Sequence, residues 1–131
     1  MDDKSKVLLI VEDEEILRNV LKDTFQKENF IVYEADNGET GLQMAADHNP
    51  HIIILDLYMP KLDGMMMLKK LRESGEYGKN VKVIILTNLD ADDKIIQDVV
   101  ETEPTYYLLK TNIKPVDVIE KVKEILSSES S

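Results

Sequence analysis

The residue in this sequence best placed to carry out chemistry is an aspartate at the end of a short apolar run. Asp56 directly follows Ile52-Ile53-Ile54-Leu55. A run that short and that apolar is typical of a strand buried on both faces, as in parallel sheets covered by helices. An ionised carboxylate at the edge of such a core is costly unless it is paired, bound to a metal or reactive. Asp56 is therefore a candidate site residue.

Four further polar residues follow predicted strands: Glu12 and Asp13 follow the first, Thr87 the fourth and Lys110 the fifth. The carboxyl ends of parallel strands lie at one edge of a sheet, so we expect these side chains to gather around Asp56. Taken singly, a threonine after a strand can simply form a turn, and a lysine there can simply extend to water. Their shared position at one edge favours a site.

The three acidic residues of this group need a positive partner. Each contact between two carboxylates costs about 4 kcal/mol at ~4 Å with an effective dielectric constant of about 20. A water-accessible cluster that offers only oxygen atoms suits Mg²⁺, or Mn²⁺ in its place, because these cations take carboxylates and keep several waters. Beside such a cation and the Lys110 ammonium, the Asp56 carboxylate can attack an electrophilic phosphorus. Thr87 would then donate a hydrogen bond to a phosphoryl oxygen.

The elements that must position these residues alternate regularly along the chain. Apolar runs predict strands at 7–11, 31–35, 52–55, 81–86 and 106–109. Helical spacing predicts helices at 16–25, 39–47, 65–73, 92–100 and 115–126, with a turn-rich loop at 75–80. With right-handed crossovers, this order predicts an α/β fold, a doubly wound (βα)5 open sheet of five parallel strands.

The length of 131 residues fits a single domain over 1–131. We expect its core to extend from about 6 to 126. The Ser/Glu-rich segment 127–131 is expected to be a frayed polar tail.

Composition argues against several kinds of site and partner. The chain has no cysteine, and two isolated histidines, His48 and His51, are a poor basis for a zinc site. A net charge of −10 disfavours direct contact with nucleic acid. No apolar stretch is long enough for a membrane span, and the first residues are acidic where a signal peptide is basic. These features favour a cytoplasmic protein that is not bound to a membrane.

Four motifs in this order and spacing resemble the receiver domains of two-component response regulators, which have a flavodoxin-like architecture. They are Val-Leu-Leu-Ile-Val-Glu-Asp-Glu-Glu at 7–15, Leu-Asp-Leu-Tyr-Met-Pro-Lys-Leu-Asp-Gly at 55–64, Ile-Ile-Leu-Thr at 84–87 and Tyr-Leu-Leu-Lys at 107–110. The resemblance extends from Lys6 to about Leu126, which is nearly the whole chain.

The resemblance implies a role for each residue of the site. Asp56 would be the phospho-acceptor, and Glu12 and Asp13 would be the acidic pair that holds Mg²⁺. The backbone carbonyl of Tyr58 would be a further metal ligand. Thr87 and Lys110 would contact the phosphoryl group. Tyr107 would move inward as Thr87 shifts.

The resemblance also implies partners. The phosphoryl group would come from a histidine kinase or a histidine phosphotransfer protein. The signal would pass to a downstream protein target or to an output domain beyond this sequence, through the surface of the predicted helix at 92–100, the last strand and the last helix. The chain would be a monomer or a phosphorylation-dependent dimer. It would be a switch rather than an enzyme, with no reaction beyond accepting its phosphoryl group and losing it by hydrolysis.

The sequence departs from the common receiver pattern at four places. Thr111 follows Lys110 where many receivers have a proline, so the lysine is expected to be held less rigidly. Glu103-Pro104 replaces a usual Gly-Ala, and Glu12 replaces an aspartate without loss of charge. Asn88 stands where a small residue is usual.

Residues at the mouth of the predicted site are expected to affect its kinetics. Tyr58, Asn88 and Leu89 should surround the open side of the phosphoryl group and obstruct an attacking water. We therefore expect slow loading from small donors and a long-lived phosphorylated state.

Two other classes of function stay open at this point. One is an interaction module that has the receiver fold and works without phosphate. The other is an enzyme of the same architecture, such as an aspartyl phosphatase or a flavodoxin. The phosphatases want a second acid at the position of Tyr58, and a flavin phosphate would be repelled by the acidic segment 12–15.

Overall fold

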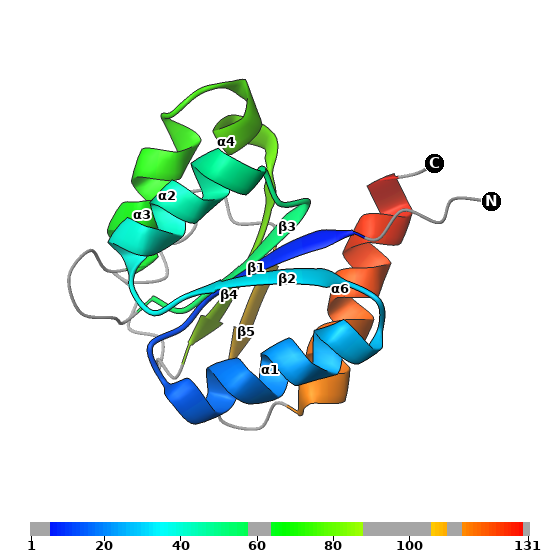
Figure 1. Ribbon diagram of the computed structural model, residues 1–131. Helices are drawn as coiled ribbons and strands as arrows, with labels where there is room; N and C mark the ends of the chain where they lie inside the picture. Colours follow the sequence, from blue (N-terminus) through cyan, green and yellow to red (C-terminus); the bar gives the residue numbers. More distant parts are fainter. Residues whose placement is uncertain (1–5, 58–63, 88–105, 110–113, 130–131) are drawn as a thin grey trace.

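The protein folds around one parallel β-sheet. The computed structural model describes residues 6–57, 64–87, 106–109 and 114–129. The sheet has five strands in the order β2-β1-β3-β4-β5, and all neighbours run parallel (Figure 1). The strands are β1 Val7–Val11, β2 Ile31–Ala35, β3 Ile52–Leu55, β4 Lys82–Thr87 and β5 Tyr106–Leu109. The predicted strands are confirmed, except that the fourth is shifted by one residue and ends at Thr87.

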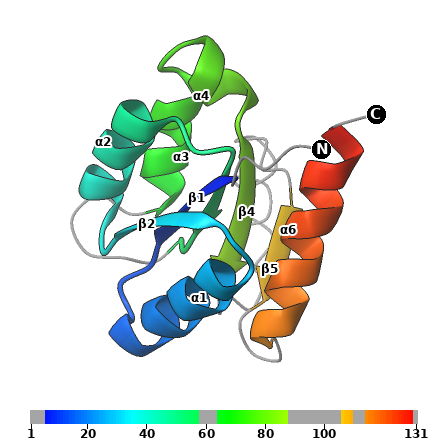
Figure 2. The same cartoon turned by 45° about the vertical axis from the view of Figure 1, so that its right-hand side comes forward.

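Helices cover both faces of this sheet (Figure 2). Those within the described residues are α1 Glu15–Lys27, α2 Gly38–His48, α3 Gly64–Arg72, α4 Glu76–Asn80 and α6 Pro115–Glu129. The core on one face contains side chains of α1 and α6, and the core on the other face contains side chains of α2 and α3. The helix predicted at 92–100 lies outside the described residues. The parallel α/β architecture with two helical layers is confirmed.

Strands β1 and β3 are apolar throughout because both of their faces are buried. In β3, Ile53 and Leu55 face the α2 and α3 layer, and Ile52 and Ile54 face the α1 and α6 layer. All four side chains are at most 1% exposed. The burial of alternate residues in two separate cores explains why the sequence shows a continuous apolar run instead of an alternating pattern.

The second helix begins and ends as its sequence predicts. The Asn37 side chain accepts a hydrogen bond of 2.9 Å from the Thr40 N–H, which caps the first turn. Asn49 ends the helix in the left-handed conformation with φ of 45°. Pro50 follows, and it cannot donate a further helical hydrogen bond.

The prediction of a loop at 75–80 was wrong, because a short helix, α4, occupies Glu76–Asn80. Arg72 stabilises the end of this helix from α3. Its guanidinium donates to the carbonyl oxygens of Gly78 at 2.9 Å and Val81 at 2.7 Å. A side chain supplied by another helix satisfies these carbonyls, and the local turn residues gave no sign of it.

The prediction of a frayed tail from 127 was also wrong for the residues that can be described. Helix α6 continues through Ser127 to Glu129. Serine is only mildly unfavourable inside a helix, so the last turn can propagate from the packed turns before it.

No helix within the described ranges has the length and apolar character needed to cross a membrane.

Phe25 tests the packing of α1 on the sheet. Its side chain is fully buried and contacts Phe30 edge to face, with ring centroids 5.1 Å apart. We expect Phe25→Ala to lower the free energy of unfolding by about 3–5 kcal/mol, since it removes a large ring from a dense core. Ile16 lies on the same helix but is 82% exposed, so Ile16→Ala should change stability by less than about 0.5 kcal/mol. Urea denaturation of both variants measures the difference, and similar losses would contradict this packing.

Candidate metal-binding site

The candidate site forms where β1 and β3 end side by side. The register pairs Val11 with Leu55, so the next residues, Glu12 and Asp56, leave the sheet together. The Asp56 N–H donates to the Val11 carbonyl at 2.9 Å, and the Glu12 N–H donates to the Ala35 carbonyl at 3.0 Å. Backbone hydrogen bonds thus fix both acidic residues at the rim of the sheet.

Three acidic side chains converge at this rim, as the sequence predicted. One carboxylate oxygen from each of Glu12, Asp13 and Asp56 lies within 4.8 Å of the other two. Glu12 is 1% exposed and Asp56 is 4% exposed, but Asp13 faces solvent. The cluster therefore has two buried carboxylates and one that water can reach. Three oxygen donors at this spacing, with an open side for water, are compatible with Mg²⁺ or Mn²⁺.

The turn that carries two of these acids is internally bonded. Oε2 of Glu12 accepts a hydrogen bond of 3.0 Å from the Glu14 N–H. Glu14 is the N-cap residue of α1, directly before the first helical residue Glu15. The side chain of Glu12 therefore points back onto the start of the helix, where a negative charge is favourable.

Arg18 on α1 contacts this turn, and Lys22 on the same helix contacts Glu34, which Arg18 also binds; neither residue was predicted from the sequence. The Arg18 guanidinium donates to the Glu12 carbonyl at 2.9 Å and to the Glu34 carboxylate at 3.0 Å. The Lys22 ammonium binds the other oxygen of Glu34 at 2.8 Å. Hydrogen bonding to Lys22 holds the pKa of the Glu34 carboxyl below its ordinary value, and Arg18 acts in the same direction. The bond to Glu34 in turn raises the pKa of Lys22. Glu34 and Lys22 therefore both stay ionised at neutral pH.

A glycine on the other side of the site was also missed as a functional residue. Gly64, the first residue of α3, donates its N–H to the Leu57 carbonyl at 2.9 Å. A Cβ at this position would lie only 2.0 Å from the backbone oxygen of Asp56. Glycine is thus required here because α3 begins in contact with the backbone of the predicted phospho-acceptor. A glycine eight residues after Asp56 was the available signal in the sequence.

The backbone places two further predicted residues near this rim. Thr87 ends β4, two residues beyond Ile85, which pairs with Leu55 of β3. Tyr107 lies in β5 and pairs with Ile85. The predictions for Tyr58, Asn88, Leu89, Lys110 and Thr111 fall outside the described residues, as does the segment Glu103-Pro104. The proposed contacts of these side chains stay predictions.

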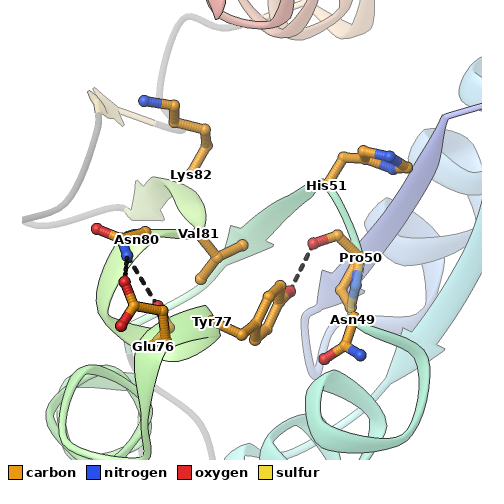
Figure 3. Close-up of a pocket in the computed structure, with 8 residues that line it drawn as sticks. All are labelled: Asn49, Pro50, His51, Glu76, Tyr77, Asn80, Val81 and Lys82. Atoms are coloured by element: carbon orange, nitrogen blue, oxygen red, sulfur yellow. Dashed lines mark hydrogen bonds between the residues drawn. The ribbon is translucent and has the colours of Figure 1, made fainter.

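A separate hollow of about 430 Å³ lies at the opposite end of the strands. It is lined by residues that precede or begin β3 and β4, among them His51 and Lys82. In Figure 3 the Tyr77 hydroxyl points at the Pro50 carbonyl, to which it donates at 2.5 Å. Burial raises the pKa of Tyr77, so this hydroxyl stays protonated and remains a donor. Because it lies at the other end of the strands, the hollow is distinct from the acidic site.

The two histidines form no metal site with other residues in the part of the chain that is described. Nδ1 of His51 accepts a hydrogen bond of 3.0 Å from the Val7 N–H. The ring of His48 stacks on Tyr33 with centroids 3.8 Å apart. Both residues are exposed, and each makes a specific contact.

Comparison with known proteins gives matches over almost the whole chain. The family model for the response regulator receiver domain matches residues 8–123. The transcriptional regulatory protein SrrA of Staphylococcus aureus is 33% identical over 122 residues, which cover 93% of this chain and 48% of SrrA. The chain thus spans about half the length of the curated relatives it matches.

Solved structures agree in fold. A putative response regulator from Chloroflexus aurantiacus is 27% identical, with a TM-score of 0.83 over 95% of this chain and 99% of the other. A CheY-like response regulator receiver domain protein from Methanospirillum hungatei has a TM-score of 0.87 at 22% identity, covering 97% of this chain and 98% of that one. The second likeness concerns the fold alone.

Substitution of Gly64 tests the close contact behind Asp56. We expect Gly64→Ala to lower the free energy of unfolding by about 3 kcal/mol or more, because the new methyl group would meet rigid backbone. Gly41→Ala is the matched control. Its methyl group would lie 2.9–3.1 Å from side-chain atoms of Val11 and Met67, so that side chains and no backbone atoms would have to move. Better helix propensity offsets part of that cost. Equal destabilisation of the two variants in urea titrations would refute the argument.

Proposed function

Because the chain belongs to the response regulator receiver family, we propose that it is a phosphorylation-controlled switch of two-component signalling in which Asp56 is the phospho-acceptor. The observation that carries this proposal is the carboxylate cluster at the rim. Asp56 ends a buried strand, is itself 4% exposed, and lies within reach of Glu12 and Asp13. A structural acid would gain nothing from two like-charged neighbours, whereas a phospho-acceptor that works with a divalent cation requires them.

Glu12, Asp13 and Asp56 would hold Mg²⁺ or Mn²⁺, with the backbone carbonyl of Tyr58 as a further ligand. When bound, the cation would offset negative charge on the transferring phosphoryl group. The chain itself contributes the position of the nucleophile. The backbone bond from Asp56 to Val11 and the contact with Gly64 fix the direction in which the carboxylate leaves the sheet. Such fixed placement of a reactive group lowers the entropic part of the barrier.

In the proposed transfer, a carboxylate oxygen of Asp56 attacks the phosphorus of a phosphohistidine. The new O–P bond forms as the P–N bond breaks, and the donor imidazole leaves with the electron pair of that bond. Lys110 and Thr87 would contact the phosphoryl oxygens. Hydrolysis of the acyl phosphate would later return the carboxylate, and Tyr58, Asn88 and Leu89 would slow that step by obstructing water. No other substrate is turned over in this scheme.

The donor would be a histidine kinase or a histidine phosphotransfer protein, in the cytoplasm. Phosphorylation would draw Thr87 toward the phosphoryl group and let Tyr107 move inward, which would bias the surface formed by the predicted helix at 92–100, β5 and α6. A downstream protein or an output domain would respond to that surface. SrrA is a transcriptional regulator, but the net charge of −10 leaves direct contact with nucleic acid to another domain or protein.

Incubation with acetyl phosphate and MgCl2, followed by intact mass measurement, tests this function. We expect the mass of one added phosphoryl group on the wild-type chain. No addition is expected for Asp56→Asn or in excess chelator, because the nucleophile or the cation is then missing. Asp47→Asn, which changes an exposed aspartate on α2, should behave as wild type. A phosphoryl group that persists on Asp56→Asn would overturn the assignment.

The acidic cluster also predicts that Mg²⁺ stabilises the folded chain. A cation that binds only the folded state at ten times its Kd adds ~1.4 kcal/mol to the free energy of unfolding. Asp13→Asn should abolish most of this gain and, without metal, should be more stable than wild type because one repulsive contact is gone.

Calorimetry with and without MgCl2 measures both effects of the Asp13 substitution. Asp47→Asn serves again as the control, and it should retain the full response to Mg²⁺. A wild-type melting temperature that ignores millimolar-range MgCl2 would count against the proposed metal site.

A further inference from the structure

The Glu12–Asp13 peptide joins two of the three acids, and its orientation is set from outside the acidic cluster. Glu12 is held at three points: its N–H by Ala35, its Oε2 by the Glu14 N–H, and its carbonyl by Arg18. The first two bonds fix the residue and its side chain. The direction of the carbonyl fixes the plane of the peptide that leads to Asp13. The bond from Arg18 therefore bears on where the exposed carboxylate lies.

Arg18 is itself held in place for this contact. Nη1 donates to the Glu12 carbonyl at 2.9 Å, while Nε donates to the Glu34 carboxylate at 3.0 Å. Its side chain is 16% exposed, and Glu34 is bound on its other oxygen by Lys22. A planar guanidinium can serve two acceptors in fixed directions at once, which a lysine ammonium on its flexible stem cannot reproduce. Through Glu34, strand β2 thus holds the Arg18 guanidinium that orients the turn after β1.

Charge alone makes Arg18 an unfavourable neighbour for a metal site. A fixed positive group close to the cluster repels a divalent cation, so by Coulomb's law its removal should tighten Mg²⁺ binding. An orienting role of Arg18 predicts the opposite change in Mg²⁺ affinity. If Arg18 serves the site through geometry, its removal should weaken binding even though a repulsive charge is lost. The two effects can therefore be separated by the direction of one measured change.

We propose that Arg18 is a positioning residue of the metal site, which holds the Glu12–Asp13 peptide in the orientation that brings the Asp13 carboxylate to the cation. The proposal rests on the proposed function, because it assumes that the acidic cluster binds Mg²⁺. Residues that orient metal ligands typically alter metal affinity by about 10- to 100-fold when they are replaced. Arg18 makes no contact with the cation in this scheme and acts only through the backbone of Glu12.

Titration of the chain with MgCl2, followed by the amide signals of Asp13 and Glu14 in two-dimensional NMR, tests the proposal. Arg18→Gln removes both the charge and the planar guanidinium that donates two hydrogen bonds. Arg18→Lys keeps the charge but loses the guanidinium. We expect the Kd for Mg²⁺ to rise about 10-fold or more in both variants. Lys27→Gln is the matched control, since it removes an exposed cation from the last turn of the same helix but leaves Arg18, Glu34 and the Glu12 carbonyl bonded. Its Kd should stay equal to or below that of wild type.

Each outcome decides the matter. An unchanged or lower Kd in Arg18→Gln would show that charge outweighs orientation and would overturn the proposal. An unchanged Kd in Arg18→Lys would do so independently, which also covers the case in which Arg18→Gln fails to fold. Well-dispersed spectra establish that a weaker affinity is not a loss of structure. A wild-type chain with no saturable Mg²⁺ response would instead refute the metal site itself, and the role of Arg18 with it.

Discussion

The rest of the structure depends on the placement of like charges at the edge of a dry sheet. Glu12 and Asp56 follow strands that are buried on both faces, so neither carboxylate can be fully hydrated. Their mutual repulsion and loss of hydration oppose folding. The two apolar cores on either side of β1 and β3 offset this cost, and the backbone bonds to Val11 and Ala35 prevent the acids from moving apart. The fold thus keeps a repulsive cluster together, and the cation of the proposed function would neutralise it.

Strands β1 and β3 could be predicted from sequence because burial on two faces leaves an unambiguous apolar run. Helix α2 was predicted within one residue at each end, since Asn37 and Asn49 carry the local chemistry of a helix start and stop. Helix α4 was not, because the group that completes its end belongs to Arg72 on another helix. The last turn of α6 was missed for a similar reason. Polar composition at 127–129 says nothing about a helix that is already nucleated by packed turns.

The residues of the site likewise divide into those that the sequence predicts and those that only tertiary contacts explain. Convergence of Glu12, Asp13 and Asp56 was predicted from their positions after the carboxyl ends of parallel strands, and the structure confirms that these residues meet. Arg18 and Gly64 escaped prediction because they act on backbone atoms. A sequence motif names side chains that face a ligand, whereas these two residues matter through a carbonyl and an absent Cβ. Both contacts arise only in the folded chain. The Glu12 carbonyl lies 2.9 Å from the Arg18 guanidinium, and the Asp56 carbonyl would lie 2.0 Å from a Cβ on residue 64.

If the acidic cluster binds a cation as proposed, these backbone contacts affect the free energy of that binding. A site whose ligands must be ordered by the metal loses affinity to the conformational entropy of that ordering. Here Glu12, which follows β1, is held at its N–H, its carbonyl and its side chain by hydrogen bonds that need no metal. Binding then has to offset mainly the dehydration of the cation, and it gains from relief of carboxylate repulsion. The exposed Asp13 gives the cation a path from solvent to the two buried acids. A rigid turn with one solvent-facing carboxylate therefore favours a site that can fill and empty while the surrounding fold stays unchanged.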